Sequence, residues 1–296
     1  MAAHRYAWVL NLDADLELAT LGRGSPYAPK RTVRDAMAPW VALLAKTLAG
    51  PADAVIEEWG GEDDDVRGMI GRAFCPTPRA VTIMERAGVV PEPHPSADVL
   101  RRVNAREFAS SLGQTLDHAE FVVDYDAACA KLASASPSGT WRVKRSFGMT
   151  GRGQRVITAG AAPEADLAFV RASFDEGGVQ IEPNVAIVAE YGLHGMLAQD
   201  GALTLGALVT QRCDARGAWI ATELVSGHED ALVALATALT DEARFVARAL
   251  AEAGYFGPFG IDAFTYRAPS GDVVLQRRSE INARYSMGFG IGYGRG

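Results

Sequence analysis

The sequence predicts an α/β protein of the α+β kind, in which a small layered domain precedes a strand-rich part. The first third alternates short apolar runs with amphipathic stretches, an order typical of strand–helix–strand–helix layers. The last third is mostly alternating apolar runs separated by turn signals, which is the pattern of antiparallel strands. One strongly amphipathic helix interrupts these strands at 228–254, with leucines along one stripe and Gly254 as its stop.

In the first third, RYAWVLNL (5–12) and ADAVIEE (52–58) are bounded apolar runs, so we expect two strands there. We expect helices at VRDAMAPWVALLAKTLAG (33–50) and TPRAVTIMERAG (77–88), each of which ends on a glycine. Pro39 falls inside the first helix and should kink it. The prolines in VVPEPHPS then mark an extended connector to the rest of the chain.

The middle third is predicted to alternate helices and strands around a glycine-rich turn. The helical segments are 98–113, 125–136 and 163–178. The strand segments are TWRVKRS (140–146), QRVI (154–157) and VQIEPNV (179–185). Later strands are expected at 186–198, 202–213 and 217–224, followed by a final hairpin of 257–267 and 272–282.

Composition excludes several classes of protein. Of the 296 residues 48% are hydrophobic and 22% charged, which suits a soluble chain with the cores of about two domains. The net charge of −7 argues against a basic surface for nucleic acid, and no apolar run approaches the ~20 residues that span a bilayer. The start, MAAHRYAWVLNLDAD, is unlike a signal peptide, and the three scattered cysteines suit the cytoplasm. We expect a homodimer, the commonest soluble assembly.

The final hairpin is predicted to bring two carboxylates together. Pairing centred on Gly271 would place Asp262 opposite Glu280. Pairing centred half a residue earlier would place Asp262 opposite Ser279 instead. In both registers the carboxylates of Asp262 and Glu280 come close, and they repel each other unless a positive charge lies between them. A hard cation with oxygen ligands would supply that charge.

Asn282 lies two residues after Glu280 and therefore on the same face of the strand. Its amide could give the cation a further oxygen ligand. Alternatively, Glu280 pairs with Arg277 or Arg278, and the hairpin is purely structural. From the residues alone both interpretations stand.

The stretch VKRSFGMTGRGQRVI (143–157) has the composition of a phosphate-binding turn. Gly148, Gly151 and Gly153 would let backbone N–H groups approach phosphate oxygens, and Lys144 on the entering strand adds a point charge. The stretch is neither a Walker loop nor GxGxxG, and an ordinary exposed glycine turn is the alternative. The predicted cation site favours phosphate binding, because the two would form halves of one nucleotide site.

The order of these parts resembles the ATP-grasp superfamily of carboxylate ligases. The shared order is a lysine strand with a glycine loop, a strand ending in IEP, an acid on the next strand, a helix, an Asp strand and a Glu-x-Asn strand. The resemblance covers residues 100–288 and implies two lobes that clamp ATP. It divides the chain into an N-terminal α/β domain at 1–100, a small lobe with the glycine loop at 101–184, and a C-terminal lobe with the metal site at 185–296.

The resemblance implies a nucleotide-binding role for several residues. In the family a hinge strand gives backbone hydrogen bonds to adenine, and this place is taken by Ile181, Glu182 and Pro183. An acid on the following strand contacts the ribose, which matches Glu190. The strand lysine that contacts the phosphates matches Lys144, and the loop of Gly148, Gly151 and Gly153 covers them.

The resemblance also implies catalytic and metal-binding residues. The family's metal ligands match Asp262, Glu280 and Asn282. Some members carry an arginine two residues after the asparagine, near the transferred phosphate or the substrate carboxylate, and Arg284 matches it. A second phosphate-binding lysine of the family is absent, and Arg106 in VNAREF is the cation that could replace it.

The family reaction turns a carboxylate and ATP into an acylphosphate and ADP, and an amine or other nucleophile then attacks the acylphosphate. The resemblance therefore implies ATP and Mg²⁺ or Mn²⁺ as cofactors, a small acid or amino acid and an amine as substrates, and neither a nucleic-acid nor a membrane partner. Two alternatives stay open. One is a kinase on the same fold that phosphorylates a small molecule, and the other is a nucleotide-binding module without turnover.

Asp13, Asp15 and Glu17 follow the first predicted strand. Ligands of α/β domains bind at the carboxyl ends of strands, so these acids could hold a substrate amine. The alternative, which we favour from the sequence, is a solvated loop and the start of a helix.

Overall fold

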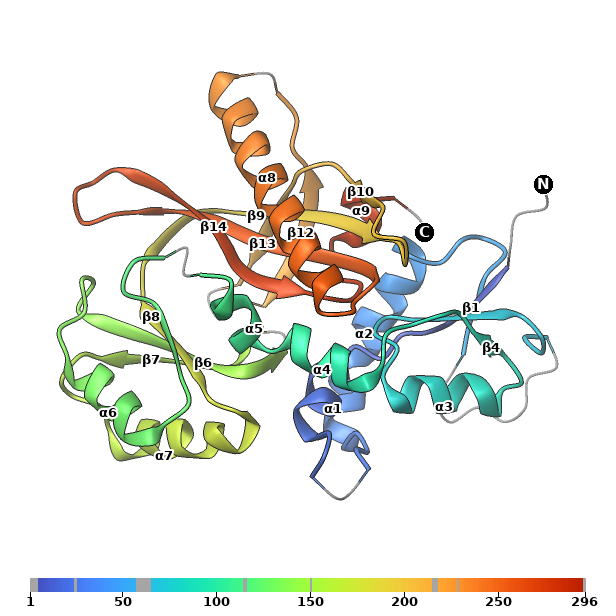
Figure 1. The fold of residues 1–296 in the computed structure, drawn as a ribbon, viewed down its shortest axis with the longest axis horizontal. Helices are drawn as coiled ribbons and strands as arrows, with labels where there is room; N and C mark the ends of the chain where they lie inside the picture. Colours follow the sequence, from blue (N-terminus) through green and yellow to red (C-terminus); the bar gives the residue numbers. More distant parts are fainter. Residues whose placement is uncertain are drawn as a thin grey trace.

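The computed structural model describes residues 5–23, 26–56, 65–113, 116–149, 151–214, 218–227 and 229–294. Three β-sheets organise them, one early in the chain, one in its middle and one late (Figure 1). This mixture of helices and sheets confirms the predicted α/β class. Among the helices within these ranges, none has both the length and the apolar character that a bilayer span requires.

The N-terminal sheet is parallel and has the strand order β2-β1-β3-β4. Its strands are β1 (Tyr6–Val9), β2 (Ala54–Val55), β3 (Ile70–Ala73) and β4 (Val90–Pro91), and its helices are α1 (Ala14–Thr20), α2 (Arg31–Thr47) and α3 (Pro78–Arg86). Alternate side chains of β1 face opposite sides of the sheet. Ala7 and Val9 therefore pack in a cluster with α3, whereas Trp8 joins the main core of the protein.

Strand β3 was not predicted, because its sequence IGRA lacks the apolar alternation of a strand. Gly71 explains why this sequence pairs between β1 and β4. A Cβ atom there would lie 2.3 Å from Met84 Sδ, so only glycine lets α3 pack this closely. The helix α2 lies where it was predicted, and it continues through Pro39 without a break. Residues 57 and 58 of the predicted second strand lie outside the described residues.

The middle sheet is antiparallel and has the order β5-β8-β6-β7. It consists of β5 (Glu120–Val122), β6 (Thr140–Met149), β7 (Arg152–Thr158) and β8 (Val179–Pro183). The helices α6 (Tyr125–Ala133) and α7 (Glu164–Ser173) and a short 3-10 turn, η1 (Phe174–Glu176), belong to the same unit. Trp141, Val143 and Ile181 are fully buried in its own hydrophobic cluster. Every predicted element of this unit is present, and β5 is an addition.

The third sheet has the order β12-β11-β9-β13-β14, with β10 also paired to β9. Its strands are β9 (Ala186–Leu197), β10 (Leu203–Leu205), β11 (Val209–Cys213), β12 (Trp219–Leu224), β13 (Gly257–Arg267) and β14 (Val273–Asn282). The long helix α8 (Asp230–Glu252) buries Leu239, Val246 and Leu250 against this sheet, as its leucine stripe predicts. A short helix, α9 (Phe289–Gly292), ends the described chain.

The segment predicted as one helix at 98–113 is two helices, α4 (Ala97–Asn104) and α5 (Arg106–Ser111). The break is at Ala105, whose backbone is extended with φ −73° and ψ 139°. Asn104 explains the break, because its amide Nδ2 donates to Ala283 O and its Oδ1 accepts from Ala283 N. These contacts attach the end of α4 to the chain just beyond β14, and α5 turns away from there toward the middle sheet.

The main hydrophobic core joins the first and third sheets. Trp8, Leu44 and Leu100 belong to the same buried cluster as Leu250 and Phe289. Of its described residues, the middle sheet contributes only Phe147 to this cluster and otherwise keeps a core of its own. The boundaries 1–100, 101–184 and 185–296 stay a prediction, but the packing places a separate lobe against a fused pair of units.

Candidate active site

The hairpin of β13 and β14 has one of the two registers that the sequence left open, and a second register nearer its turn. Near the site, Asp262 pairs directly with Glu280, as centring on Gly271 predicts. A β-bulge follows, and the turn half of the hairpin, where Arg267 pairs with Val273, is centred on Ser270, one residue earlier. The bulge therefore sets which side chains face each other at the polar end of the hairpin.

Glu280 does not pair with Arg277 or Arg278, as the structural alternative supposed. Arg278 binds Glu242 of α8, with Nη1 and Oε1 2.5 Å apart, and Arg277 lies 3.9 Å from the same carboxylate. Glu280 instead accepts from Arg106 at the start of α5, with Oε1 3.0 Å from Nη2. Its partner thus comes from another part of the chain, across the cleft described below.

The pKa values of the two facing carboxylates of the hairpin are shifted in opposite directions. Burial raises the pKa of Asp262 to about 6, and the negative charge of Glu280 contributes to this rise. Hydrogen bonds from Gln211 Nε2 at 3.0 Å and Asn282 Nδ2 at 2.9 Å act in the opposite direction. Burial also acts to raise the pKa of Glu280, but the positive charges of Arg106, Lys144 and Arg284 outweigh it and lower the pKa.

These residues fit a magnesium ion that is shared with a ligand. Asp262 and Glu280 provide facing carboxylates, and the amide of Asn282 could present its oxygen by rotating, because O and N of an amide are interchangeable in shape. Within the described residues no three His, Cys, Asp or Glu side chains form a closed metal cluster. Mg²⁺ typically binds through one or two carboxylates together with substrate phosphates, so a closed protein cage is not needed.

Two cations face this group from the middle sheet and from α5. Lys144 lies on β6, and its Nζ is 2.5 Å from Glu182 Oε1 at the end of β8. Arg106 Nε donates to Arg145 O at 3.1 Å, which fixes its guanidinium between β6 and β14. Both cations line the cleft, so they are placed to bind an anion that enters it.

The glycine-rich turn joins β6 to β7 at the mouth of the cleft. Gly148, Gly151 and Gly153 line the cleft, and residue 150 lies outside the described residues. Gly151 has φ +71° and Gly153 has φ +85°, a conformation that residues with a side chain rarely adopt. The backbone conformation of the turn therefore requires glycine, whether or not a ligand lies close to it.

The predicted hinge strand is only partly at the cleft. Glu182 and Pro183 line it, but Ile181 does not. The side chain of Ile181 is fully buried in the core of the middle sheet, and its backbone pairs with Glu120 on one side and Val143 on the other. The side chain of Ile181 is therefore part of the core, and a backbone contact of Ile181 to adenine stays a prediction. The side chains of Ile181 and Glu182 face opposite sides because they alternate along β8.

Glu190, on β9, lines the cleft, where its predicted contact with the ribose requires it to be. Met287 and Gly288, which follow β14, line the cleft as well. The cleft has a volume of about 800 Å³ and lies between the middle sheet and the third sheet. Sequence reasoning missed several of its wall residues, mostly on β9 and the hairpin of β11 and β12: Val185, Ile187, Val188, Gln211, Arg212, Cys213, Asp214, Trp219 and Ile220. No local motif marks these positions, because they belong to ordinary alternating strands.

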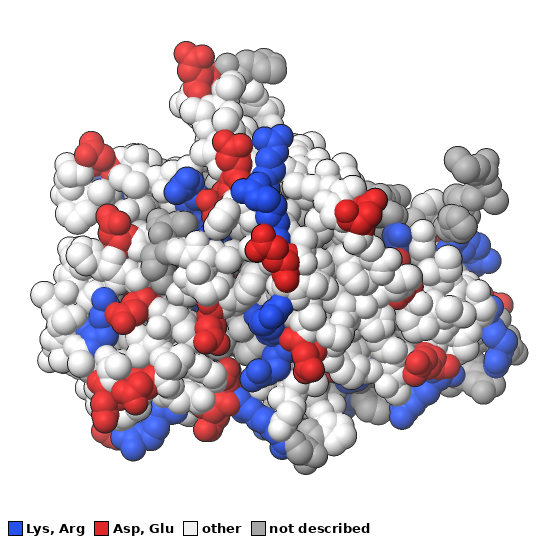
Figure 2. Space-filling model, in the orientation of Figure 1, with Lys and Arg blue, Asp and Glu red and all other residues white. Residues whose placement is uncertain are grey.

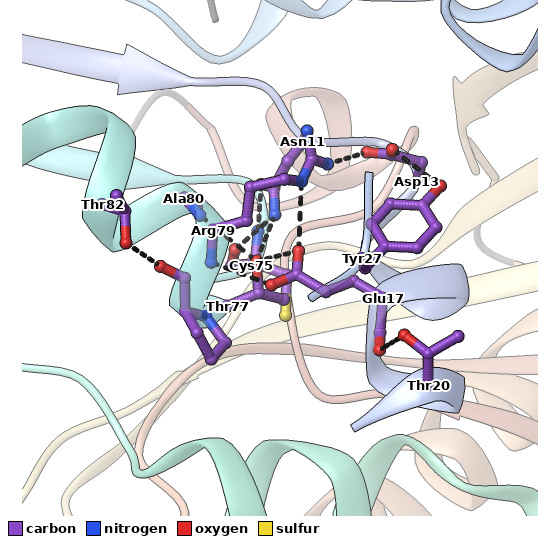
Figure 3. A network of polar contacts seen from close by, with 11 residues as sticks. Asn11, Asp13, Glu17, Thr20, Tyr27, Cys75, Thr77, Arg79, Ala80 and Thr82 are labelled. Atoms are coloured by element: carbon purple, nitrogen blue, oxygen red, sulfur yellow. Dashed lines mark hydrogen bonds and ion pairs between the residues drawn. The ribbon is translucent and has the colours of Figure 1, made fainter. Parts of the chain in front are cut away.

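The acids that follow β1 are buried, which corrects the expectation of a solvated loop. Arg79 of α3 binds Asp13 and also Glu17, with Arg79 Nε 3.3 Å from Glu17 Oε2 (Figure 3). Tyr27 donates to Asp13 at 3.0 Å, and Thr77 donates to Glu17 at 2.6 Å. These two acids therefore hold α1, the loop after it and α3 together, rather than a substrate amine.

Asp15 faces the other way, into the cleft, and both of its carboxylate oxygens bind Arg284. Arg284 Nε is 3.2 Å from Asp15 Oδ1, and Nη2 is 2.7 Å from Oδ2. The guanidinium also lies over the ring of Phe74, 5.3 Å from its centroid. Asp15 thus contacts the predicted catalytic arginine rather than a substrate amine.

Comparison of the whole fold with solved structures shows what these parts are. N5-carboxyaminoimidazole synthetase from Staphylococcus aureus, complexed with ADP, matches with a TM-score of 0.51 and 13% identity, over 95% of this chain and 71% of that one. D-alanyl-alanine synthetase A from Vibrio cholerae matches with a TM-score of 0.53 and 12% identity, over 94% of this chain and 88% of that one. Both are ATP-grasp enzymes. The chain has the ATP-grasp fold.

An ATP-bound carboxyaminoimidazole ribonucleotide synthase from Aspergillus clavatus matches in the same way, with a TM-score of 0.50 and 12% identity over 96% of this chain and 71% of that one. No protein-family model and no curated sequence matches the chain. The likeness to ATP-grasp structures therefore lies in the fold, and it extends over the N-terminal sheet as well as the two lobes.

Proposed function

We propose that this protein is an ATP-dependent ligase, which activates a carboxylate as an acylphosphate and couples it to an amine. One observation carries the proposal. A single cleft is lined on one side by Lys144 and the glycine turn, and on the other by Asp262, Glu280 and Asn282. ATP-grasp neighbours with bound ADP or ATP, at identities of 12–13%, support the placement of a nucleotide in this cleft.

The cations of the cleft would act on the phosphates of ATP. Lys144 and Arg106 are each paired with an acid, Glu182 and Glu280 respectively. An entering triphosphate offers several anionic oxygens and could take over both cations, which would release Glu280 toward the metal side. Arg284 would then add fixed positive charge where negative charge accumulates during phosphoryl transfer.

Asp262, Glu280 and Asn282 would hold Mg²⁺, or Mn²⁺ in its place. When bound, the ion would neutralise charge on the phosphate oxygens of ATP. The chain's own contribution is to keep two carboxylates in register on one rigid hairpin. The glycine turn would cover the phosphates and exclude water, which would otherwise hydrolyse the acylphosphate.

The substrates in this proposal are a small carboxylic acid and an amine, such as an amino acid. The segments 1–100, 101–184 and 185–296 would act as the N-terminal domain and the two clamping lobes. The three cysteines of the chain are free, which suits the reducing cytoplasm. A homodimer stays a prediction.

The first test is thermal unfolding with ATP, with and without Mg²⁺, for the native protein and Glu280→Ala. A ligand at 100 times its Kd stabilises a fold by about 2.7 kcal/mol, so the native melting temperature should rise only when Mg²⁺ is present. Glu280→Ala should lose this rise. The matched control is Asp272→Ala, which removes an exposed acid from the turn of the same hairpin and should keep it.

An equal response of Glu280→Ala and Asp272→Ala would contradict the metal assignment. If the native response is as expected, acids and amines are screened for release of ADP. An amide product would support the ligase, a stable phosphoester would identify a kinase, and tight binding without ADP release would identify a binding module.

A further inference from the structure

We infer that Asp15 is a positioning residue, which holds the Arg284 guanidinium in the orientation that meets the transferred phosphoryl group. This inference rests on the proposed function. The contact joins the N-terminal sheet to the catalytic hairpin, since Asp15 lies on α1 and Arg284 follows β14. The side chains are 7% and 12% exposed respectively, so water does not compete strongly for the pair.

The geometry of the pair constrains the guanidinium fully. Both Asp15 oxygens bind the edge of the guanidinium formed by Nε and Nη2. A carboxylate that binds through two parallel hydrogen bonds fixes the plane of the guanidinium as well as its position. The ring of Phe74 supports the same group from its face, and the backbone N–H of Tyr285 donates to Phe74 O at 3.0 Å.

The remaining donors show what the pair leaves available. A guanidinium has five N–H donors. Two of them bind Asp15, and one on Nη1 donates to Tyr285 O at 3.1 Å. The two that remain belong to the terminal nitrogens Nη1 and Nη2, and Arg284 lines the cleft. Asp15 therefore occupies the inner edge of the guanidinium and leaves donors of the outer nitrogens for an anion in the cleft.

The charges of the pair indicate that Asp15 positions Arg284 and does not remove its positive charge from the site. A guanidinium stays charged in proteins, and the adjacent Asp15 carboxylate compensates the cost of burying that charge. Asp15 thus stabilises the buried positive charge of Arg284 beside the proposed phosphate site. The carboxylate itself lies behind the guanidinium as seen from that site. Without this support, the flexible arginine side chain could adopt other rotamers and lose alignment with the reacting group.

The start of the same helix provides a matched control, because Asp13 is the N-cap of α1. The side chains of Asp13 and Asp15 are 9% and 7% exposed, and each binds one arginine. Asp13 binds Arg79 of α3, and it does not line the cleft. A purely structural role for Asp15 therefore predicts that Asp13→Asn and Asp15→Asn have similar consequences. A positioning role predicts that only Asp15→Asn changes the recognition of the phosphoryl group.

The experiment compares binding of MgADP alone with binding of MgADP plus aluminium fluoride, which mimics a phosphoryl group in transfer. The native protein should bind the fluoride complex more tightly than MgADP, because sites are complementary to the transition state. Asp15→Asn should weaken the fluoride complex by about 10- to 100-fold, the cost typical of a lost supporting contact, while MgADP affinity stays the same. Asp13→Asn should match the native protein in both titrations.

Asp15→Glu is the second variant, because it keeps the buried charge and should fold even if Asp15→Asn does not. Its longer side chain displaces the guanidinium, so it should also weaken the fluoride complex selectively. In an Arg284→Lys background, Asp15→Asn should have little further effect, since no guanidinium remains to be oriented.

Three results would overturn the inference: native-like fluoride binding in the Asp15 variants, an equal loss in Asp13→Asn, or no gain from fluoride in a native protein that binds MgADP. Failure of the proposed function would look different. In that case the native protein would not bind MgADP at all, and the comparison of Asp15 with Asp13 would fall together with the nucleotide site.

Discussion

His194 is buried in the third sheet without a charged partner. It lies on β9 with 1% of its surface exposed, and its ring packs against Phe289. Its Nδ1 has no hydrogen-bond partner among the described residues. Burial accordingly lowers its pKa from 6.5 to about 4. No sequence pattern singles out this histidine, because its burial depends on packing against α9 and β13.

We predict that His194 weakens the fold in mild acid. The unfolded chain would bind a proton near pH 6.5, but the folded protein only near pH 4, so stability falls as pH drops through this window. At pH 5 the loss should be about 2 kcal/mol relative to pH 8. The measurement is urea unfolding of the native protein and His194→Gln at both pH values. The native protein and His194→Gln share every other titratable group. An equal pH dependence of their stability would therefore show that His194 does not contribute to it.

Among the elements, the hairpin of β6 and β7 is the one whose backbone depends most on glycine. Gly153 has φ +85° and lines the cleft, and an added Cβ atom would lie 3.5 Å from Phe147 O. The contact is acceptable, so the cost of a side chain comes from the backbone conformation. The split between α4 and α5 is also decided at this scale, since Asn104 binds the backbone of Ala283 and places Arg106 at the start of α5.

We predict that Gly153→Ala impairs closure over ATP more than it destabilises the fold. The substitution should cost about 1 kcal/mol of stability, as is usual for a residue forced into this conformation. Turnover of ATP should fall about tenfold, and a larger share of ATP should be hydrolysed without coupling, because water enters an imperfectly closed site. The readout is the ratio of ADP released to amide formed, together with thermal unfolding.

Gly201→Ala is the matched control for Gly153→Ala. Gly201 has φ +84° in the turn between β9 and β10, outside the cleft, with open space around its Cα. It should show the same loss of stability with unchanged turnover and coupling. If both variants couple normally, the glycine turn has no covering role.

At the scale of the whole molecule, the middle sheet is a lobe with its own core, and the other two sheets share one. Leu250 of α8 lies in the cluster that includes Trp8 of the first sheet. Leu132 of α6 lies in the separate cluster of the middle sheet. The cleft lies between these two cores, so its width can change without disrupting either. On the face shown in Figure 2, acidic and basic side chains are interspersed rather than gathered by sign.

We predict that the two cores respond independently to mutation. Leu250→Ala and Leu132→Ala should each cost about 2–5 kcal/mol, because both side chains are almost fully buried. Hydrogen exchange should distinguish them. Leu250→Ala should increase exchange in the first and third sheets together, whereas Leu132→Ala should increase it mainly in the middle sheet. Uniform acceleration by both variants would mean that the protein opens as a single unit.

The sequence by itself determined the features that depend on neighbouring residues. Strand alternation and turn residues sufficed to bring Asp262 close to Glu280, although the register stayed open by one position. The spacing of glycines sufficed to identify the turn that requires Gly151 and Gly153. The order of such local features was also enough to indicate the ATP-grasp fold. These inferences hold because backbone periodicity and turn geometry act over a few residues.

Only the tertiary structure decided how distant parts meet. Asp15 and Arg284 are 269 positions apart, and Arg106 and Glu280 are 174 apart, so no local pattern could pair them. Ile181 shows another limit of local patterns. Its position in the IEP motif matches the family's hinge strand, but packing between β5 and β6 buries its side chain. Which charges become partners depends on which faces of the sheets come together, and that is set by burial across the whole molecule.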